Sequence, residues 1–358
     1  MGQPDEDPVP PQVVQRVAVV GLGRAGVAHA VMLAHVPGCE LIAVADPRAS
    51  ARAALRGMGF ATPAYARLER LLEKVRPDAV VVCTAQHERA RIAEIVVRSG
   101  IPTLVERPMA RTLAEAEALV KLAESRRVPL AVGHPLAHEP VFARLHQLVH
   151  EGVLGPVRQA RSAMFVSRVF APRPRYGPGR LDPRRVAGGV VAHLGSDLLF
   201  VLVRMFGVPV EARADWSLLY GAVEDELHAM MTLADGAEVG FDCSWSVSGY
   251  VRASTVIELA GRDGRLLASD EALELDLARP AAGLPAGYTR LRDADFPARA
   301  RFDFGGDALW LHDAAFLDWL AGGPAPPNEA RVALEAHRVM DALYRSAAAG
   351  GITVKVTA

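Results

Sequence analysis

The feature that most constrains the fold is a glycine-rich turn at residues 21–26, which read GLGRAG. It follows an apolar run at residues 16–20 and precedes a helical pattern, which is the strand–turn–helix context of dinucleotide-binding turns. Gly21 permits the tight turn, Gly23 lets the backbone approach a pyrophosphate, and Gly26 lets the helix pack closely on the strand. The alternative is a glycine turn in an α/β domain that binds no nucleotide.

A carboxylate follows the second predicted strand. That strand covers residues 40–45 and ends at Asp46, twenty residues after Gly26. A carboxylate here can accept hydrogen bonds from both ribose hydroxyls and would repel a 2′-phosphate, so we predict NAD rather than NADP. Arg48 complicates this prediction, because its guanidinium could bind that phosphate. The predicted cofactor contacts in this part of the chain are Gly21, Gly23, Arg24, Ala25, Gly26, Asp46 and Arg48.

The pattern of predicted elements changes after residue 134. Before it, strands and helices alternate, which predicts an α/β Rossmann fold: a doubly wound parallel sheet with ligands at the carboxyl ends of its strands. After it, consecutive strands joined by short turns predict an α+β domain with an open antiparallel sheet. The predicted parts are an acidic, proline-rich disordered tail at 1–12, a Rossmann domain at 13–134 and an α+β domain at 135–358.

Composition excludes several classes of function. A net charge of −1 provides no field to attract nucleic acid or an anionic membrane. The three cysteines form no C-x-x-C pair, so we expect reduced thiols and a cytoplasmic location. We expect no membrane span, no signal peptide and, because motifs such as H-E-x-x-H are missing, no metal.

Polar residues also follow later strands of the predicted parallel sheet. Because the carboxyl ends of parallel strands share one edge, we expect these residues to line the cofactor. They are Thr84, Gln86 and His87 after one strand, Glu106 and Arg107 after the next, and His134 after the last. For His134 a hydrogen-bonded structural role is the alternative.

Further motifs occur along the chain in a specific order. They are CTAQ at 83–86, ERP at 106–108, VGH at 132–134, a double glycine at 188–189, VED at 223–225 and YRSA at 344–347. With these motifs, the glycine turn and Asp46, the chain from Arg16 onward resembles the Gfo/Idh/MocA family of glucose–fructose oxidoreductases, inositol dehydrogenases and rhizopine-catabolism proteins. The resemblance implies hydride transfer between NAD and a secondary alcohol or ketone of a sugar- or cyclitol-like substrate. It also implies a homodimer or homotetramer formed through the open sheet.

The chain departs from this family where the chemistry is expected. Family members typically have lysine where this chain has Arg107, and D-x-x-x-H where it has His193 followed by Asp197. Residues four apart share a helical face, so we predict His193 as the general acid/base and Asp197 as a group that orients the ring or binds a substrate hydroxyl. Arg107 cannot shuttle protons and is predicted to position the substrate near the nicotinamide. The alternatives are a structural His–Asp pair and a harmless exchange of lysine for arginine, since lysines are just three of the 40 basic residues.

A long loop at 173–189, rich in Pro, Gly and Arg, carries the remaining candidates. Six arginines at positions 168–185, including Arg175, could bind an anionic substrate such as a sugar acid. Tyr176 could donate a hydrogen bond to a carbonyl. The alternatives are a solvated loop and a packing tyrosine. We predict an NAD-dependent oxidoreductase; the rival hypotheses are a net non-redox enzyme that retains NAD, for elimination or glycoside cleavage, and a non-catalytic NAD-bound sensor.

Overall fold

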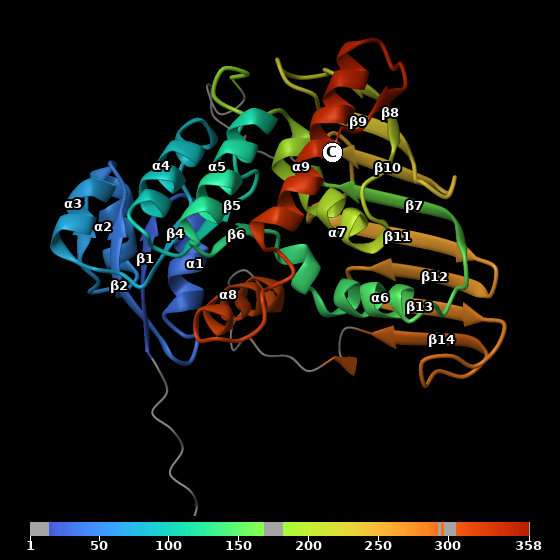
Figure 1. The fold of residues 1–358 in the computed structure, drawn as a ribbon, viewed down its shortest axis with the longest axis horizontal. Helices are drawn as coiled ribbons and strands as arrows, with labels where there is room; N and C mark the ends of the chain where they lie inside the picture. Colours follow the sequence, from blue (N-terminus) through green and yellow to red (C-terminus); the bar gives the residue numbers. More distant parts are fainter. Residues whose placement is uncertain (1–13, 168–181, 293–294, 297–305, 358) are drawn as a thin grey trace, which may run out of the picture.

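The computed structural model describes residues 14–167, 182–292, 295–296 and 306–357 (Figure 1). Its first sheet has six parallel strands in the order β3-β2-β1-β4-β5-β6, the arrangement of dinucleotide-binding Rossmann domains. Continuous apolar runs form the central strands because both faces are covered; every residue of β4 is buried. The strands are β1 (Gln15–Val20), β2 (Cys39–Ala45), β3 (Ala64–Tyr65), β4 (Ala79–Val82), β5 (Thr103–Glu106) and β6 (Leu130–Gly133).

Helices cover both faces of this sheet, which confirms the doubly wound prediction. Val80 and Val82 pack in one cluster with α3, α4 and α5, whereas Val19 and Val81 pack on the opposite face with α1 and α2. Thr112 caps the N-terminus of α5, since its Oγ1 accepts a hydrogen bond of 3.2 Å from the backbone N–H of Glu115. The helices are α1 (Arg24–Leu33), α2 (Ala49–Gly57), α3 (Leu68–Lys74), α4 (Gln86–Arg98) and α5 (Leu113–Arg126).

The second sheet has nine strands in the order β14-β13-β12-β11-β7-β10-β9-β8-β15. Its neighbouring strands are antiparallel, as predicted, apart from β7 and β10, which run parallel, so the sheet is mixed. The parallel pair arises because the chain leaves β7 through a helix before β8, β9 and β10 return to it. The strands are β7 (Val157–Phe165), β8 (Glu211–Ser217), β9 (Glu226–Thr232), β10 (Glu238–Ser244), β11 (Ser254–Gly261), β12 (Gly264–Ser269), β13 (Ala272–Leu277), β14 (Gly287–Arg292) and β15 (Val354–Lys355).

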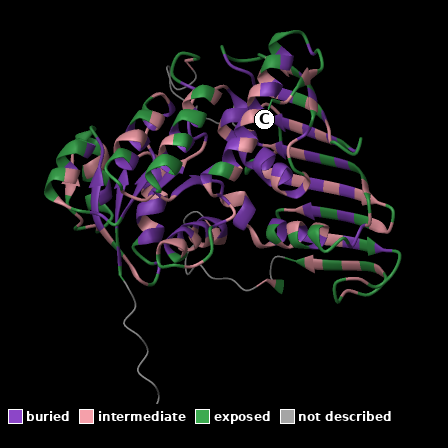
Figure 2. Ribbon diagram, viewed as in Figure 1, coloured by how far each residue is buried: buried purple, intermediate pink, exposed green. Residues whose placement is uncertain are grey.

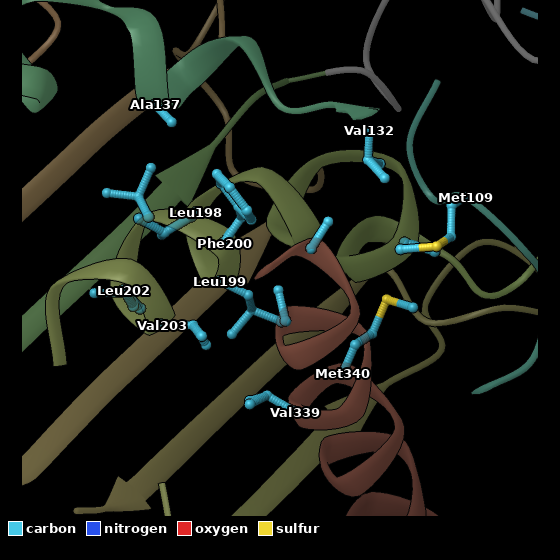
Figure 3. Packing of buried hydrophobic residues seen from close by; sticks show 14 of the residues in the cluster. Met109, Val132, Ala137, Leu198, Leu199, Phe200, Leu202, Val203, Val339 and Met340 are labelled. Atoms are coloured by element: carbon cyan, nitrogen blue, oxygen red, sulfur yellow. The ribbon is translucent and has the colours of Figure 1, made fainter. Parts of the chain in front are cut away.

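Helices bury one face of this second sheet. Figure 3 shows Leu199 of α7 pointing toward α9, which carries Val339 and Met340. On the strands, buried and more exposed residues alternate, so one face is left open within the described residues (Figure 2). The elements are the short helix η1 (Pro135–His138), α6 (Pro140–His150), the π-helical turn η2 (Val191–Gly195), α7 (Ser196–Phe206), α8 (Gly306–Leu320) and α9 (Ala330–Ala348). Among the described residues, no helix is both long and apolar enough to cross a membrane.

The sequence did not predict α8, the short strand β3 or the strands β12, β13, β14 and β15. Phe316 and Leu317 of α8 are buried against Ala30 and Leu33 of α1. A late segment of the chain therefore covers part of the Rossmann sheet (Figure 1). The polar pair His312 and Asp313 on its buried face obscured the helical pattern, because the apolar stripe is interrupted there.

Candidate active site

The glycine turn joins β1 to α1. Gly21 has a φ of +94°, which favours glycine, and a Cβ there would lie 2.6 Å from the backbone of Cys83. A Cβ on Gly26 would overlap the carbonyl oxygen of Gly21, so the helix packs directly on the turn. A Cβ on Gly23 would meet no heavy atom within 4 Å beyond its chain neighbours, which leaves room for a ligand to approach the backbone.

Asp46 lies beside this turn at the end of β2 and is buried. Its Oδ2 accepts a 2.7 Å hydrogen bond from the backbone N–H of Leu22, and its Oδ1 accepts one of 2.8 Å from that of Arg48. Arg48 Nη2 also donates to Asp46 Oδ2 at 2.9 Å, although 55% of the Arg48 side chain is exposed. Burial opposes the charged form, but the bonds from Arg48 and Leu22 outweigh it and lower the pKa of Asp46. The carboxylate is therefore ionised and held next to the glycine turn.

The other predicted cofactor residues lie at the same edge of the sheet. Thr84 Oγ1 is buried without a hydrogen-bond partner among the described residues, an arrangement that a bound polar ligand would complete. Together with the space at Gly23 and the carboxylate of Asp46, this hydroxyl fits a dinucleotide. The remaining residues at this edge are Arg24 and Ala25 at the start of α1, Gln86 and His87 at the start of α4, Glu106 and Arg107 at the end of β5, and His134 after β6.

The double glycine lets a buried carboxylate hold the start of η2. Glu224 Oε2 accepts a 2.7 Å hydrogen bond from the backbone N–H of Gly189, and Oε1 accepts one of 3.2 Å from that of Val191. The hydroxyl of Tyr344 donates to Glu224 Oε1 at 2.7 Å. A Cβ on Gly188 would overlap the Tyr344 hydroxyl, and one on Gly189 would overlap the Glu224 carbonyl. The distant VED and YRSA motifs therefore position the helix that carries His193.

His193 lies in the π-helical turn η2, a geometry common at functional sites, and its side chain is half-buried. Gln86 Nε2 lies 3.4 Å from its Nδ1 and 3.5 Å from its Nε2, which is long for a hydrogen bond. Gln86 itself is anchored, because its Oε1 accepts a 2.7 Å bond from the backbone N–H of Ala187. The ring of Trp245 lies 6.0 Å away, centroid to centroid. His193 thus stands between the end of β4 and the second sheet, as an acid/base group at this edge would.

Arg107 and Asp197 form an ion pair beneath His193. Arg107 Nε lies 3.2 Å from Asp197 Oδ2, and Arg107 Nη1 donates a 2.9 Å hydrogen bond to the carbonyl of His193. Asp197 Oδ1 lies 3.3 Å from Nδ1 of His134, whose ring stacks on Phe200 at 4.2 Å. Burial lowers the pKa of His134 despite the nearby carboxylate. The structure thus joins β5, β6 and α7 through Asp197, whose role in orienting the His193 ring stays a prediction.

The substrate residues predicted in the long loop, Arg175 and Tyr176, lie outside the described residues. Two later arginines of that loop are described. Arg184 pairs with Asp182 at 2.8 Å, and Arg185 Nη2 lies 3.2 Å from Nε2 of His87. The loop therefore reaches the edge where the cofactor residues lie.

The structure also contains a buried polar cluster that the sequence analysis did not identify. His29 of α1 contacts Glu106, a predicted cofactor residue, and Asp313 of α8, which also contacts His312. His29 follows Gly26 by three positions and so lies on the same helical face, which was the available signal. Nothing in the local sequence indicated its partner on α8.

A cavity of about 440 Å³ lies next to this site, between α5, β8 and α9. Arg111, Gly188, Glu224 and Tyr344 are among its lining residues, whereas His193, Arg107 and Asp197 are not.

Comparisons with protein families match two consecutive parts of the chain. Residues 15–134 match the oxidoreductase family with an NAD-binding Rossmann fold, and residues 142–267 match the GFO/IDH/MocA C-terminal domain. A myo-inositol dehydrogenase of Streptomyces leeuwenhoekii is 29% identical over 94% of this chain and 99% of its own length. A UDP-N-acetylglucosamine 3-dehydrogenase of Acidithiobacillus ferrooxidans is 27% identical over 90% of this chain and 97% of its own.

Solved structures share the whole fold. The NADH complex of a levoglucosan dehydrogenase has a TM-score of 0.85 at 18% identity, covering 96% of this chain and 99% of that one. The NAD complex of GenD2 from gentamicin A biosynthesis has a TM-score of 0.80 at 25% identity, covering 99% of this chain and all of that one. Both domains therefore have the architecture that the sequence predicts.

Proposed function

This chain belongs to the Gfo/Idh/MocA family of NAD(P)-dependent oxidoreductases that act on CH–OH groups, and from that premise we propose an NAD-dependent dehydrogenase that oxidises a secondary alcohol of a sugar- or cyclitol-like substrate. The observation that carries the proposal is the meeting of His193 and Arg107 at the edge where the glycine turn and Asp46 lie. In this proposal His193 is the proton acceptor and Arg107 the fixed cation, and both lie at the edge of the sheet that would hold the nucleotide.

The cofactor residues fit NAD. The turn at 21–26 would hold the pyrophosphate, Asp46 the adenosine ribose, and Thr84 a polar group of the nicotinamide half. When bound, NAD supplies the hydride acceptor at the carboxyl ends of β4, β5 and β6. We assign NAD over NADP because Asp46 is ionised and would repel a 2′-phosphate.

His193 is proposed to take the proton of the substrate hydroxyl. Its ring is half-buried and lies beside Gln86, whose Nε2 is 3.4 Å from Nδ1 and 3.5 Å from Nε2. Imidazole is the side chain that most often serves as a general acid or base in enzymes. Arg107 cannot take this role, because its guanidinium stays charged; it polarises and orients the substrate.

Asp197 is proposed to position Arg107. The carboxylate neutralises the guanidinium in a largely buried site, where an unpaired charge would be costly. Nε of Arg107 pairs with Asp197 and Nη1 donates to the His193 carbonyl, which fixes the guanidinium at this edge of the sheet. With Arg185 near His87, this arrangement favours an anionic substrate such as a sugar acid.

The test is a screen of sugars, cyclitols and their acid forms with NAD, following NADH formation. His193→Asn should retain the fold and bind NADH but lower kcat by about 10²–10⁴-fold. For the unsubstituted enzyme, kcat/KM for alcohol oxidation should rise with pH through a single histidine-like pKa. Near-normal turnover of His193→Asn with an unchanged pH profile would remove His193 from the mechanism.

Two controls separate the rival functions. Product formation without stoichiometric NADH release would indicate the net non-redox enzyme that retains NAD. Tight NADH binding with no turnover on any substrate class would indicate the sensor. Equal activity on neutral and acidic forms, unaffected by Arg185→Ala, would refute the anionic substrate but leave the dehydrogenase proposal intact.

A further inference from the structure

A histidine in the interior of the Rossmann domain has carboxylates at both ring nitrogens. Nδ1 of His29 lies 2.9 and 3.0 Å from the two carboxylate oxygens of Asp313, and Nε2 lies 3.1 Å from Oε1 of Glu106. Just 1% of the His29 side chain is exposed, and none of Asp313 is. A carboxylate can accept but not donate, so both nitrogens carry protons and the ring is an imidazolium.

The neighbouring histidines have other kinds of partner at their ring nitrogens. Asn328 Nδ2 donates to the carbonyl of Val132 at 2.6 Å and to Nε2 of His312 at 2.9 Å. Nδ1 of His312 therefore carries its proton and donates to Asp313 Oδ1 at 3.0 Å. Nε2 of His138 donates to Asn328 Oδ1 at 3.0 Å. Among the histidines of this network, His29 is the ring with a carboxylate at each nitrogen.

Glu106 connects this buried cation to the active site. Its Oε1 faces His29, and its Oε2 accepts a 3.1 Å hydrogen bond from the backbone N–H of Arg107. Gly133 on β6 leaves room for the carboxylate, because a Cβ there would lie 3.2 Å from Glu106 Cδ. Both oxygens are therefore held at the end of β5, one residue before the guanidinium that pairs with Asp197.

We propose that His29 is a positioning residue: a buried imidazolium, anchored by Asp313 of α8, which holds Glu106 ionised and in place at the nicotinamide end of the sheet. Its effect passes through Glu106 to the strand end that presents Arg107. The location of the nicotinamide rests on the proposed function, whereas the charge on His29 does not.

The electrostatics of the cluster agree with this geometry. Burial opposes the charge on His29, but Asp313 and Glu106 outweigh it and raise its pKa to about 10. Burial likewise opposes the charge on Glu106, yet His29, with Arg107 and Arg89, lowers its pKa to about 2. The other titratable group whose ring faces His29 is His312, at 5.9 Å between centroids.

The same side chains can be compared with a metal site. Three side chains each offer one possible ligand atom, and these atoms lie within 4.8 Å of one another: His29, His312 and Asp313. In a metal centre, ligand atoms converge on a point between them. Here both Nδ1 atoms instead lie 2.9–3.0 Å from the Asp313 oxygen itself, so that oxygen occupies the point of convergence as an acceptor. The geometry therefore favours an ion pair.

The charge can be tested on the unsubstituted, full-length protein without cofactor. Nitrogen NMR of ¹⁵N-labelled histidines should show one imidazole with both ring nitrogens protonated at about pH 8, where ordinary histidines are neutral. The signal should disappear in His29→Gln. The finding of no doubly protonated ring at that pH, or of a stoichiometric bound metal by elemental analysis, would overturn the proposal even if the variant failed to fold.

The positioning role is tested by comparing two probes, NADH and ADP-ribose. His29→Gln should weaken NADH binding by about tenfold or more, since a charge-assisted contact that holds Glu106 is lost. ADP-ribose affinity should stay within about twofold, because the glycine turn and Asp46 remain. His138→Gln, a matched change of a neutral histidine in the same cluster, should alter neither affinity.

Equal losses of NADH and ADP-ribose affinity in His29→Gln would show general damage to α1 and refute a positioning role. An unchanged NADH affinity would also refute it. Both probes bind without substrate, so the two proposals can fail separately. If the dehydrogenase proposal alone is wrong, the unsubstituted protein should bind NADH, His29→Gln should weaken that binding, and no substrate should be turned over.

Discussion

Replacement of Asp46 by alanine should convert the cofactor preference of this enzyme. Asp46 accepts hydrogen bonds from the backbone of Leu22 and from Arg48, whose guanidinium covers the same carboxylate. The adenosine ribose of NAD must compete for these acceptor sites. Because 55% of the Arg48 side chain is exposed, it can swing away at little cost and still remain near the ribose. In Asp46→Ala, Arg48 loses its ion-pair partner and becomes available to a 2′-phosphate.

The size of the effect follows from the number of contacts. Loss of hydrogen bonds from ribose hydroxyls to a charged acceptor costs about 1.5–3 kcal/mol, which corresponds to roughly 10- to 150-fold weaker NAD binding. NADP binding should change in the opposite direction, because the repulsion disappears and Arg48 supplies a charge-assisted contact to the phosphate. The ratio of the two dissociation constants should therefore change by at least about 10²-fold.

This ratio is measured by titrating the unsubstituted protein and three variants with NADH and with NADPH, and by following nicotinamide fluorescence. Asp46→Ala should favour NADPH, Arg48→Ala should keep NADH preference, and the double variant should lose most discrimination. Tighter NADPH binding by the unsubstituted protein would refute the assignment of NAD. An unchanged ratio in Asp46→Ala would show that the carboxylate serves the glycine turn through Leu22 and does not read the ribose.

Three further predictions test the surroundings of the site. Arg107→Lys should raise KM for an anionic substrate by about tenfold with a smaller change in kcat, because a single ammonium cannot contact Asp197 and the His193 carbonyl as the guanidinium does. Improved turnover would show instead that arginine is a neutral exchange for lysine. Glu224→Gln should lower the free energy of unfolding in urea by about 1–3 kcal/mol, since an amide cannot accept all three hydrogen bonds of the carboxylate, and an unchanged unfolding midpoint would contradict this. The pKa of His29 is about 10 in the folded protein, above its value of about 6.5 when unfolded, so its contribution to stability is complete below about pH 6.5 and declines as the pH rises toward 10. Unfolding free energies should be measured between about pH 6.5 and 7.5, below the range in which the cysteines of the unfolded chain ionise. They should fall with pH in the unsubstituted protein and stay flatter in His29→Gln.

The sequence alone was sufficient for the features that depend on local spacing. The three glycines, the apolar strands and the carboxylate of Asp46 predicted the parallel sheet and its ligand edge, because these signals lie close together in the chain. The family was predicted from these features together with the ordered motifs along the chain. The double glycine before His193 also formed part of the resemblance to the family. Its physical reason, the space that Glu224 and Tyr344 require, was visible in the structure alone.

Tertiary structure decided which charged groups meet. The sequence placed Asp197 on the same helical face as His193, but its contacts with Arg107 and His134 come from two strands that are brought together by the sheet. His29 and Asp313 lie 284 positions apart, and the helix that carries Asp313 was not predicted. A buried ion pair leaves little trace in either local sequence, because each partner interrupts its own apolar pattern and is stabilised by a charge elsewhere in the chain. The charge state of the site therefore depends on packing between distant segments, which spacing along the chain does not encode.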